Sequence, residues 1–142
     1  MEYPPVEVRR GKIRDCVNVV FRCFSVEEVE QLLRRLGWVD VLTGHEATLL
    51  GQPPILQLQY PVVLEFLRYH MRLFRLGGEI VGNVHYNGIA LQFEPPDLHK
   101  ADHEKGLEFL KRQLEREGGG KIKVEMGREC NILIVDNCGG CA

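Results

Sequence analysis

Two cysteines near the end of the sequence, Cys138 and Cys141, are separated only by Gly139 and Gly140. Two thiols at this spacing can bind one soft metal ion or form a disulfide, and the glycines permit the tight turn that either arrangement requires. A thioredoxin-type site places its first cysteine at a helix N-terminus, where the helix dipole lowers the thiol pKa. Cys138 follows a predicted strand and we expect no helix after it, so this arrangement is excluded. Residues 138–142 are therefore predicted to form a tail with a reactive dithiol or half of a metal site, unless its cysteines are incidental.

Two further cysteines, Cys130 and Cys23, lie in predicted strands. If residues 130–136 form one strand with a rise of about 3.3 Å per residue, Cys130 lies about 20 Å from Cys138. One ion with metal–sulfur bonds of about 2.3 Å cannot bridge that distance. The same spacing argument separates Cys16 from Cys23. Alternation places Cys130 and Cys23 on apolar strand faces, so we expect small buried side chains. The alternative is that folding, a partner or a second copy of the chain supplies the missing ligands of the tail.

The histidines supply other candidate metal ligands. His99 and His103 are four residues apart, which is the spacing of two imidazole ligands on one helix face. His70 lies in the apolar sector of another predicted helix, where a buried imidazole needs a hydrogen-bond partner or a metal. The alternatives are ordinary surface histidines and a hydrogen-bonded core histidine. The predicted metal ligands are Cys138, Cys141, His99 and His103, with His70, Cys130 and Cys23 as additional candidates. Zinc or an iron–sulfur cluster is the cofactor that this donor set favours, and the alternative is that none is bound.

The composition is that of an ordinary globular domain, and it excludes several functions. Of the 142 residues, 27% are charged and 44% are hydrophobic, and the net charge of −2 gives no general attraction to nucleic acid or anionic lipid. No apolar run reaches the roughly 18 residues that a membrane-spanning helix needs. The N-terminus lacks the layout of a signal peptide, so we expect a cytoplasmic protein. An odd count of five cysteines then favours metal binding, redox chemistry or burial over a disulfide framework.

Hydrophobic periodicity and turn residues predict the elements that position these side chains. Ser25 and Glu28 form a capping box for the first of three predicted helices. Asn87 and Gly88 predict the turn of a hairpin over residues 80–94. The predicted helices are 25–36, 61–76 and 97–117. Further strands are predicted within residues 13–24, 38–50, 55–60, 121–126 and 130–135.

Hairpins imply antiparallel pairing, so these elements predict an α+β two-layer sandwich with a mostly antiparallel sheet and three helices. The expected organisation is a single domain over residues 1–137, followed by the cysteine-containing tail 138–142. The predicted helix 61–76 is apolar around most of its circumference. It is therefore expected to be buried in the core or against a second subunit.

Three functions compete on these grounds. The first is a small cytoplasmic accessory protein, working with a protein partner or as a homodimer. Its Cys138/Cys141 dithiol binds or transfers a metal or an iron–sulfur species, or exchanges a disulfide. The second is a non-catalytic ligand-binding or dimerisation module whose pocket or interface is shaped by the predicted helix 61–76 and hairpin 80–94, with an incidental tail. The third, an enzyme with Cys138 as nucleophile, ranks last because the sequence identifies neither a base nor an oxyanion site.

Overall fold

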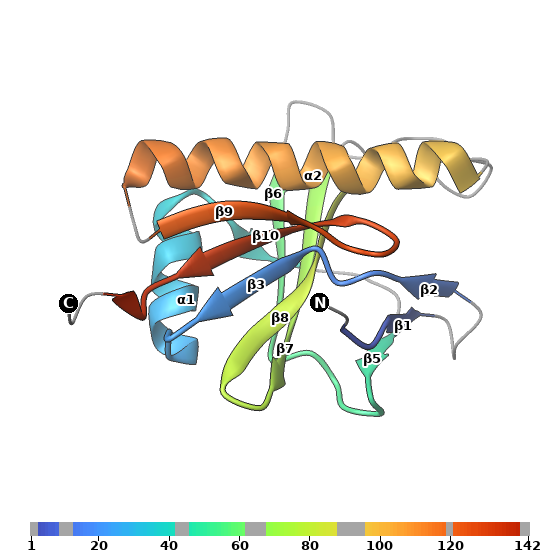
Figure 1. Cartoon of the computed structure of the whole chain (residues 1–142), viewed down its shortest axis with the longest axis horizontal. Helices are drawn as coiled ribbons and strands as arrows, with labels where there is room; N and C mark the ends of the chain where they lie inside the picture. The colour runs from blue at the N-terminus through green and yellow to red at the C-terminus, as the bar shows by residue number, and fades with distance from the viewer. Residues whose placement is uncertain are drawn as a thin grey trace.

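The computed structural model describes residues 3–8, 13–41, 46–61, 68–87, 96–118 and 121–139. In these residues ten strands form two sheets, and two helices, α1 (Val26–Arg35) and α2 (Pro96–Glu117), pack beside them (Figure 1). The strands are β1 (Val6–Val8), β2 (Ile13–Asp15), β3 (Val19–Arg22), β4 (Val39–Asp40), β5 (Ala47–Leu49), β6 (Leu56–Pro61), β7 (Arg68–Leu76), β8 (Glu79–Asn87), β9 (Lys121–Met126) and β10 (Asn131–Asp136).

The larger sheet has seven strands in the order β4-β6-β7-β8-β3-β10-β9, and the smaller sheet has the order β2-β1-β5. In the larger sheet β3 and β10 run parallel, whereas the other neighbouring strands pair antiparallel. Figure 1 shows β9, β10 and β3 running across the view while β6, β7 and β8 run steeply through it, so this sheet is strongly twisted. The predicted α+β class is confirmed, with a mixed large sheet and a small antiparallel one.

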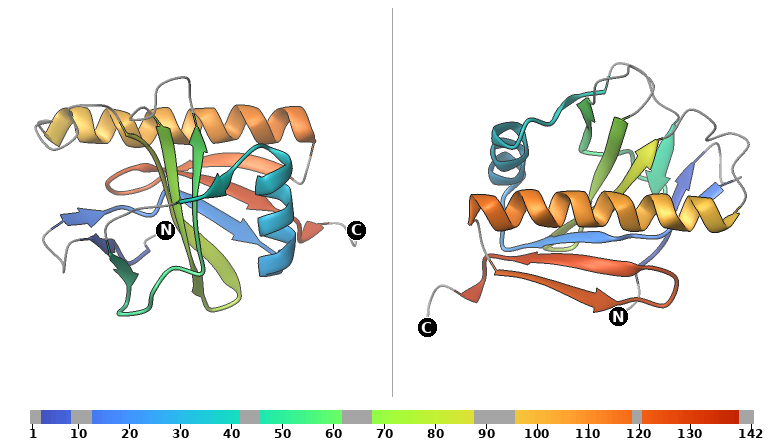
Figure 2. Two further views of the ribbon diagram at one scale, coloured as in Figure 1. Left: turned by 180° about the vertical axis from the view of Figure 1, so that it is seen from behind. Right: turned by 90° about the horizontal axis from the view of Figure 1, so that it is seen from above.

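The larger sheet buries side chains on both of its faces. Successive residues of a strand point to opposite faces, so Val19 and Phe21 belong to one core whereas Val20 belongs to another. The first core includes buried side chains of α1 and α2, such as Leu33. The second includes Val6 and other residues of the smaller sheet. The helices and the smaller sheet therefore cover opposite faces of the larger sheet (Figure 2), which adds a third layer to the expected sandwich.

Helix α1 begins where the sequence predicts. Ser25 Oγ accepts a hydrogen bond from Glu28 N at 3.1 Å, and Glu28 Oε1 accepts one from Ser25 N at 2.8 Å, so the capping box is confirmed. The helix ends before Gly37, whose φ of 103° is a left-handed conformation that favours glycine. A Cβ at Gly37 would also lie 2.8 Å from Tyr60 Cε2, so the position requires glycine for two independent reasons.

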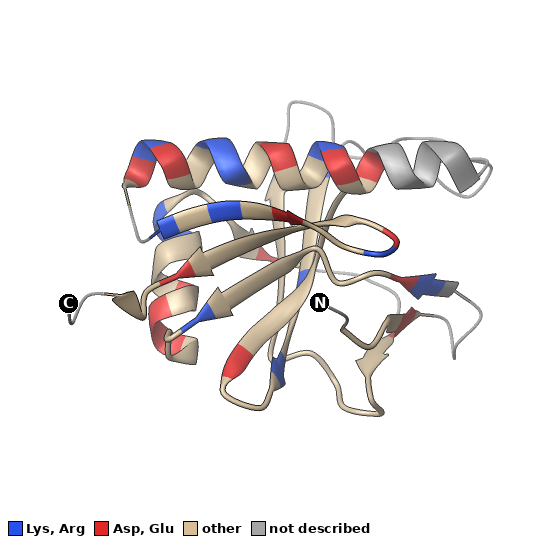
Figure 3. Ribbon diagram, viewed as in Figure 1, with Lys and Arg blue, Asp and Glu red and all other residues tan. Residues whose placement is uncertain are grey.

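Helix α2 confirms the helix predicted over residues 97–117. Its leucines Leu107, Leu110 and Leu114 are buried in the first core, as their spacing indicates. Acidic and basic residues are interspersed along the described part of this helix (Figure 3). Neither helix within the described ranges is long and apolar enough to cross a membrane.

The predicted helix over residues 61–76 is wrong where the structure describes it, because residues 68–76 form strand β7. Residues 62–67 lie outside the described part. β7 lies between β6 and β8 and is buried on both faces, so its sequence lacks the apolar–polar alternation of a half-exposed strand. Tyr69, Met71 and Leu73 face the helices, whereas Phe74 faces the smaller sheet. The described residues therefore contain two helices rather than three.

The predicted hairpin over residues 80–94 is also changed. Strand β8 covers its first half, but β8 pairs with β7 around Gly77 and Gly78, which close a turn instead of ending a helix. Gly88 and residues 89–94 lie outside the described part, so the predicted turn at Asn87-Gly88 is not placed. Residues 79–82 of β8 pair with β7 on one side and with β3 on the other.

Candidate functional site

The parallel strands β3 and β10 carry cysteines at both ends. Val19 pairs with Leu133 in this ladder, Cys16 and Cys130 precede the paired residues, and Cys23 and Cys138 follow them. Disulfides join Cys16 to Cys130 and Cys23 to Cys138, with Cα–Cα distances of 6.5 and 5.2 Å. Two bridges therefore close opposite ends of the same strand pair. Cys130 and Cys138 therefore lie at opposite ends of β10, as their spacing along a strand predicts.

The Cys23–Cys138 bond lies on the surface, because both residues are exposed. Cys23 has a φ of 61°, which turns the chain sharply between β3 and the start of α1. On the other side, Asn137 N donates to Arg22 O at 3.0 Å and extends the parallel pairing by one hydrogen bond. Cys138 N then donates to Asp136 Oδ1 at 2.7 Å, which bends the tail towards Cys23. The expectation of a buried Cys23 is wrong, because its neighbours are a turn and the tail.

Asp136 adds an oxygen to the two sulfurs. One ligand atom each of Cys23, Asp136 and Cys138 lies within 4.8 Å of the others, and among the described residues this is the group that could hold a metal ion. Two thiolates and a carboxylate suit Zn²⁺, which needs one further ligand to complete a tetrahedron. Metal binding requires both cysteines as thiolates, so it is chemically exclusive with the disulfide.

Charged side chains surround this end of the strand pair. Arg22 Nε lies 2.6 Å from Glu79 Oε2, and Tyr3 Oη donates to Glu79 Oε1 at 3.2 Å. The hydrogen bond to Glu79 raises the pKa of Arg22 further, so its charge is permanent and is balanced by that carboxylate. Lys121 pairs with Asp136 in the β9–β10 ladder, and its Nζ would lie 3.1 Å from a Cβ at Gly139. The ammonium of Lys121 therefore lies close to Gly139, just after Cys138 (Figure 3 shows basic residues at the start of β9).

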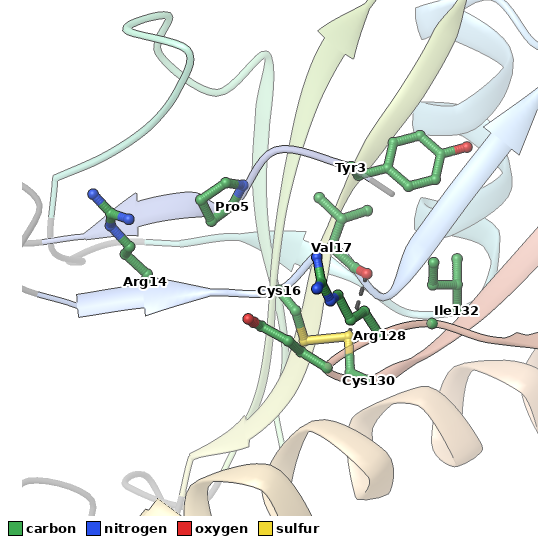
Figure 4. A pocket seen from close by; sticks show the side chains of 10 residues that line it. Tyr3, Pro5, Arg14, Cys16, Val17, Arg128, Cys130 and Ile132 are labelled. Carbon is green, nitrogen blue, oxygen red and sulfur yellow. Dashed lines mark hydrogen bonds between the residues drawn. A yellow bond between two sulfur atoms is a disulfide. The ribbon is translucent and has the colours of Figure 1, made fainter. Parts of the chain in front are cut away.

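The second bridge, Cys16–Cys130, forms part of a pocket of about 310 Å³ (Figure 4). Cys130 is 8% exposed, and Cys16 is half-buried. Cys130 Sγ lies 3.4 Å from Val17 O, an acceptor for its thiol in the reduced state. Gly127 N donates to Cys130 O at 3.0 Å and closes the turn between β9 and β10, where a Cβ on Gly127 would overlap Cys130 O. The expectation that Cys130 is buried is confirmed, but it is a disulfide partner and not a simple apolar side chain.

A buried polar cluster lies elsewhere in the molecule, between β2, β7, β8 and α2. His70 and Arg72 of β7 stand directly opposite His85 and Asn83 of β8. The ring centroids of His70 and His85 are 5.4 Å apart, and those of His85 and His103 are 5.5 Å apart. The cluster consists of Asp15, His70, Arg72, Asn83, His85 and His103, all of them buried.

The electrostatics of this cluster keep His85 neutral. Burial lowers its pKa well below the usual value, the neighbouring His70 and His103 lower it further, and Asp15 opposes the shift only in part. Burial also lowers the pKa of Arg72, against the attraction of Asp15. Asn83 Nδ2 donates to Asp15 Oδ2 at 3.4 Å, and His103 Nε2 lies 3.8 Å from Asp15 Oδ1. Asp15 is therefore the anion around which the buried side chains are arranged.

Helix α2 closes this cluster at Gly106. A Cβ on Gly106 would lie 2.7 Å from His85 Cα and 2.7 Å from Val84 O, so only glycine allows the helix to approach the strand this closely. Asn18 reinforces the same contact, because its Nδ2 donates to Val84 O at 2.8 Å and to His103 O at 3.2 Å. The cluster is thus fixed by backbone contacts as well as by its own side chains.

The predicted site residues are divided among these places. Cys138 lies beside Cys23, and Cys130 lies beside Cys16. His70 and His103 belong to the polar cluster, and neither joins the group of Cys23, Asp136 and Cys138. The backbone of His99 lies in α2, but its side chain and all of Cys141 lie outside the described part.

Sequence reasoning did not identify Asp136, Lys121, Asp15 or Arg72 as parts of a site. Asp136 and Lys121 are adjacent to the tail in the ladder of β9 and β10, and the Asp136–Cys138 spacing was visible as a turn signal. Asp15 and Arg72 could not be identified in this way, because they come together through contacts between elements far apart in the sequence. No protein-family model, no curated protein and no solved structure matches this chain, so the candidate function is argued from the geometry of these residues.

Proposed function

We propose that this chain is a small accessory protein that exchanges a disulfide with a protein partner through Cys23 and Cys138. The observation that carries the proposal is the exposed bond between these two cysteines, at the end of β3 and just after β10. A thiolate can reach an exposed disulfide, and exposed disulfides are typically the labile or catalytic ones. Their buried counterparts typically resist reduction.

The exchange proceeds in two balanced steps. A partner thiolate attacks Cys138 Sγ, forms a mixed disulfide and releases Cys23 as a thiolate. A second partner thiolate then attacks the partner sulfur of the mixed disulfide and releases Cys138. The partner dithiol loses two electrons and two protons and becomes a disulfide, and Cys23 and Cys138 receive them as two thiols.

Cys141 gives the same bond a second route. Its thiolate can attack Cys138 Sγ and release Cys23, which moves the disulfide to the Cys138–Cys141 pair without any net transfer of electrons. Cys138 is then the shared sulfur, and Cys23 and Cys141 are its alternating partners. The Cys138/Cys141 pair noted in the sequence and the Cys23–Cys138 bridge would then be two states of the same disulfide.

Two charges of opposite sign act on Cys138. The carboxylate of Asp136, whose Oδ1 accepts from Cys138 N, disfavours the thiolate, whereas the ammonium of Lys121 beside Gly139 favours it. Cys138 is the leaving thiolate of the second step, and a stabilised thiolate leaves faster, so Lys121 is assigned the role of favouring the release of Cys138 beside a carboxylate.

Zinc binding in the reduced state is the second candidate function. It is favoured by the ligand atoms of Cys23, Asp136 and Cys138, which lie within 4.8 Å of one another. Cys141 is the nearest further donor in the sequence and would supply the fourth ligand. An iron–sulfur cluster fits less well, because such clusters are usually held by four thiolates. Among the described residues, Cys23 and Cys138 are the cysteines at this end of the strand pair, and even with Cys141 from the sequence a cluster would need a donor from a partner.

Timed reduction tests the proposed exchange. The oxidised, folded protein is treated with dithiothreitol, quenched with iodoacetamide at intervals and analysed by peptide mapping. Cys23 and Cys138 should be labelled before Cys16 and Cys130, because their bond is exposed. Lys121→Gln should slow labelling of the first pair and leave the second unchanged, and Lys111→Gln, at a partly exposed position of α2, serves as the charge-matched control. If Cys23 and Cys138 react only when the protein unfolds, exchange is not their function.

A further inference from the structure

We propose that the pocket beside Cys16–Cys130 binds an anionic low-molecular-weight thiol, of the class of cysteine-containing peptides with unblocked carboxylates, which forms a mixed disulfide with Cys16. This site uses the opposite end of the strand pair from Cys23 and Cys138, so it does not depend on the proposed function. It adds a modification site and a class of ligand.

The pocket has the size of a small-ligand site. Its volume is about 310 Å³, and it is an open pocket lined by the N-terminal segment, the end of β2 and the turn between β9 and β10. Its lining residues are Tyr3, Pro5, Arg14, Cys16, Val17, Gly127, Arg128, Glu129, Cys130 and Ile132. Figure 4 shows the sulfur–sulfur bond among these side chains. A bound peptide would therefore contact the disulfide directly.

The charges around the pocket favour an anion. Arg14 and Arg128 supply two guanidinium groups, against the single carboxylate of Glu129. Arg14 is engaged only at 3.9 Å with Glu7, and its side chain is 70% exposed, so it retains donors for a ligand. Guanidinium groups bind carboxylates through paired hydrogen bonds. Among the lining residues two cations face one carboxylate, and Glu7 lies 3.9 Å from the more exposed of these cations, Arg14.

The two sulfurs of the bridge differ in accessibility. Cys16 is half-buried whereas Cys130 is only 8% exposed, so an incoming thiolate reaches Cys16 Sγ more readily. A thiolate attacks a disulfide in line with the bond that breaks. In Figure 4 Arg14 lies away from the bond on its Cys16 side. A carboxylate held by Arg14 would place the thiol of the same molecule near Cys16.

The step balances without any other oxidant, because the disulfide itself accepts the electrons. The ligand sulfur bonds to Cys16 Sγ, the Cys16–Cys130 bond breaks, and Cys130 leaves as a thiolate that takes a proton from water. The new Cys130 thiol has an acceptor in place, since its Sγ lies 3.4 Å from Val17 O. The reverse attack by Cys130 expels the ligand and restores the bridge, so the modification is reversible.

A comparison of two thiols of opposite charge tests the site. The variant Cys23→Ser/Cys138→Ser/Cys141→Ser retains only the Cys16–Cys130 pair, so its behaviour is independent of the proposed exchange. It is incubated with glutathione, which is anionic, or with cysteamine, which is cationic, and adducts are located by peptide mapping. Each rate is divided by the rate of the same thiol with a small unstructured disulfide. We expect glutathione to modify Cys16 roughly three- to tenfold faster than cysteamine on this scale.

Two further measurements fix the origin of that preference. Arg14→Gln/Arg128→Gln should remove it, whereas the control Arg116→Gln on α2 should retain it. High salt should reduce it in the triple-serine variant itself, which gives a readout that requires no change in the pocket. Equal normalised rates for the two thiols, a preference that survives the paired arginine substitutions, or an adduct on Cys130 in place of Cys16 would each overturn the proposal.

Discussion

Cys23 and Cys138 are 115 residues apart in the sequence, yet their Cα atoms lie 5.2 Å apart because β3 and β10 run parallel and in register. The same register brings Cys16 to Cys130 at the other end of the strands. The two bridges therefore overlap along the chain, since the loop closed by Cys16 and Cys130 contains Cys23 but not Cys138. Their contributions to stability must be coupled.

Overlapping bridges across the same strand pair predict a non-additive loss of stability on removal. When one bridge already joins the two strands, the second closes a loop of only about 15 residues that runs through the first bridge. In the chain-entropy account this adds about 3 kcal/mol to the free energy of unfolding. A bridge that acts alone closes a loop of about 115 residues, which is worth about 4.7 kcal/mol. Removing the first bridge should thus cost less free energy of unfolding than removing the last one. Urea unfolding of Cys16→Ser/Cys130→Ser, Cys23→Ser/Cys138→Ser and the fourfold variant measures both terms. Losses of unfolding free energy that add within experimental error would contradict this coupling of the two bridges.

Reduction should create a metal site at Cys23, Asp136 and Cys138. The reduced protein is expected to bind one Co²⁺ or Zn²⁺ per chain, with the sulfur-to-cobalt charge-transfer absorption of a thiolate site. Cys23→Ser or Cys138→Ser should abolish this absorption, and Asp136→Asn should weaken binding by roughly tenfold, or about 1.4 kcal/mol. The control Cys16→Ser/Cys130→Ser should retain it. A cobalt spectrum that is unchanged in Cys23→Ser would show that the metal is bound by other residues.

Gly106→Ala should destabilise the protein although alanine is the better helix former. The added Cβ would lie 2.7 Å from both His85 Cα and Val84 O, and neither backbone atom can move without displacing β8. We expect a loss of about 1–3 kcal/mol in the free energy of unfolding, which exceeds the helix-propensity gain of about 1 kcal/mol. Gly78→Ala is the control, because nothing lies within 4 Å of its added Cβ and its φ is not in the left-handed region. Equal effects at the two glycines would mean that α2 does not pack on β8 at this distance.

The free energy of unfolding should decrease as the pH is lowered below neutrality, because of His85. Burial and the neighbouring histidines lower its pKa in the folded protein, so the unfolded chain binds this proton first as the pH decreases. The contribution is fully present above the unfolded pKa of about 6.5 and is lost as the pH falls from there towards the folded pKa. The slope is about 1.4 kcal/mol per pH unit for one group, and His85→Gln should reduce the measured slope by that amount. Above about pH 7.5, where an ordinary histidine is neutral, the variant and the parent should show the same pH dependence. An unchanged slope below neutrality in His85→Gln would assign the effect to another group.

Local signals in the sequence predicted the helices that exist. The Ser25/Glu28 capping box and the leucine spacing of α2 involve residues three or four apart, and such contacts form irrespective of how the sheet is ordered. Strand β7 was misread because it is buried on both faces, so its apolar run lacks the alternation by which a half-buried strand is recognised. The positions of Arg68, Arg72 and Arg75 happen to suit one helical stripe, which reinforced the error.

The cysteine pairing could not be predicted from spacing alone. The sequence shows that Cys130 is too far from Cys138 along a strand, and this holds, but it does not show that β3 lies parallel to β10. A parallel pair joined by most of the chain leaves no turn signal between its strands. The polar cluster could not be predicted for the same reason, because Asp15, His85 and His103 meet only when β2, β8 and α2 pack together.

The reduction potential of the Cys23–Cys138 pair tests the central claim most directly. The protein is equilibrated in glutathione buffers of known potential, quenched by alkylation, and the oxidised fraction of each pair is read by peptide mapping. The same titration of Cys16→Ser/Cys130→Ser isolates the exposed pair. An exchanging disulfide should titrate at roughly −180 to −270 mV while the protein stays folded. A value below about −300 mV, or reduction that occurs only with unfolding, would identify a structural crosslink and contradict the proposed function.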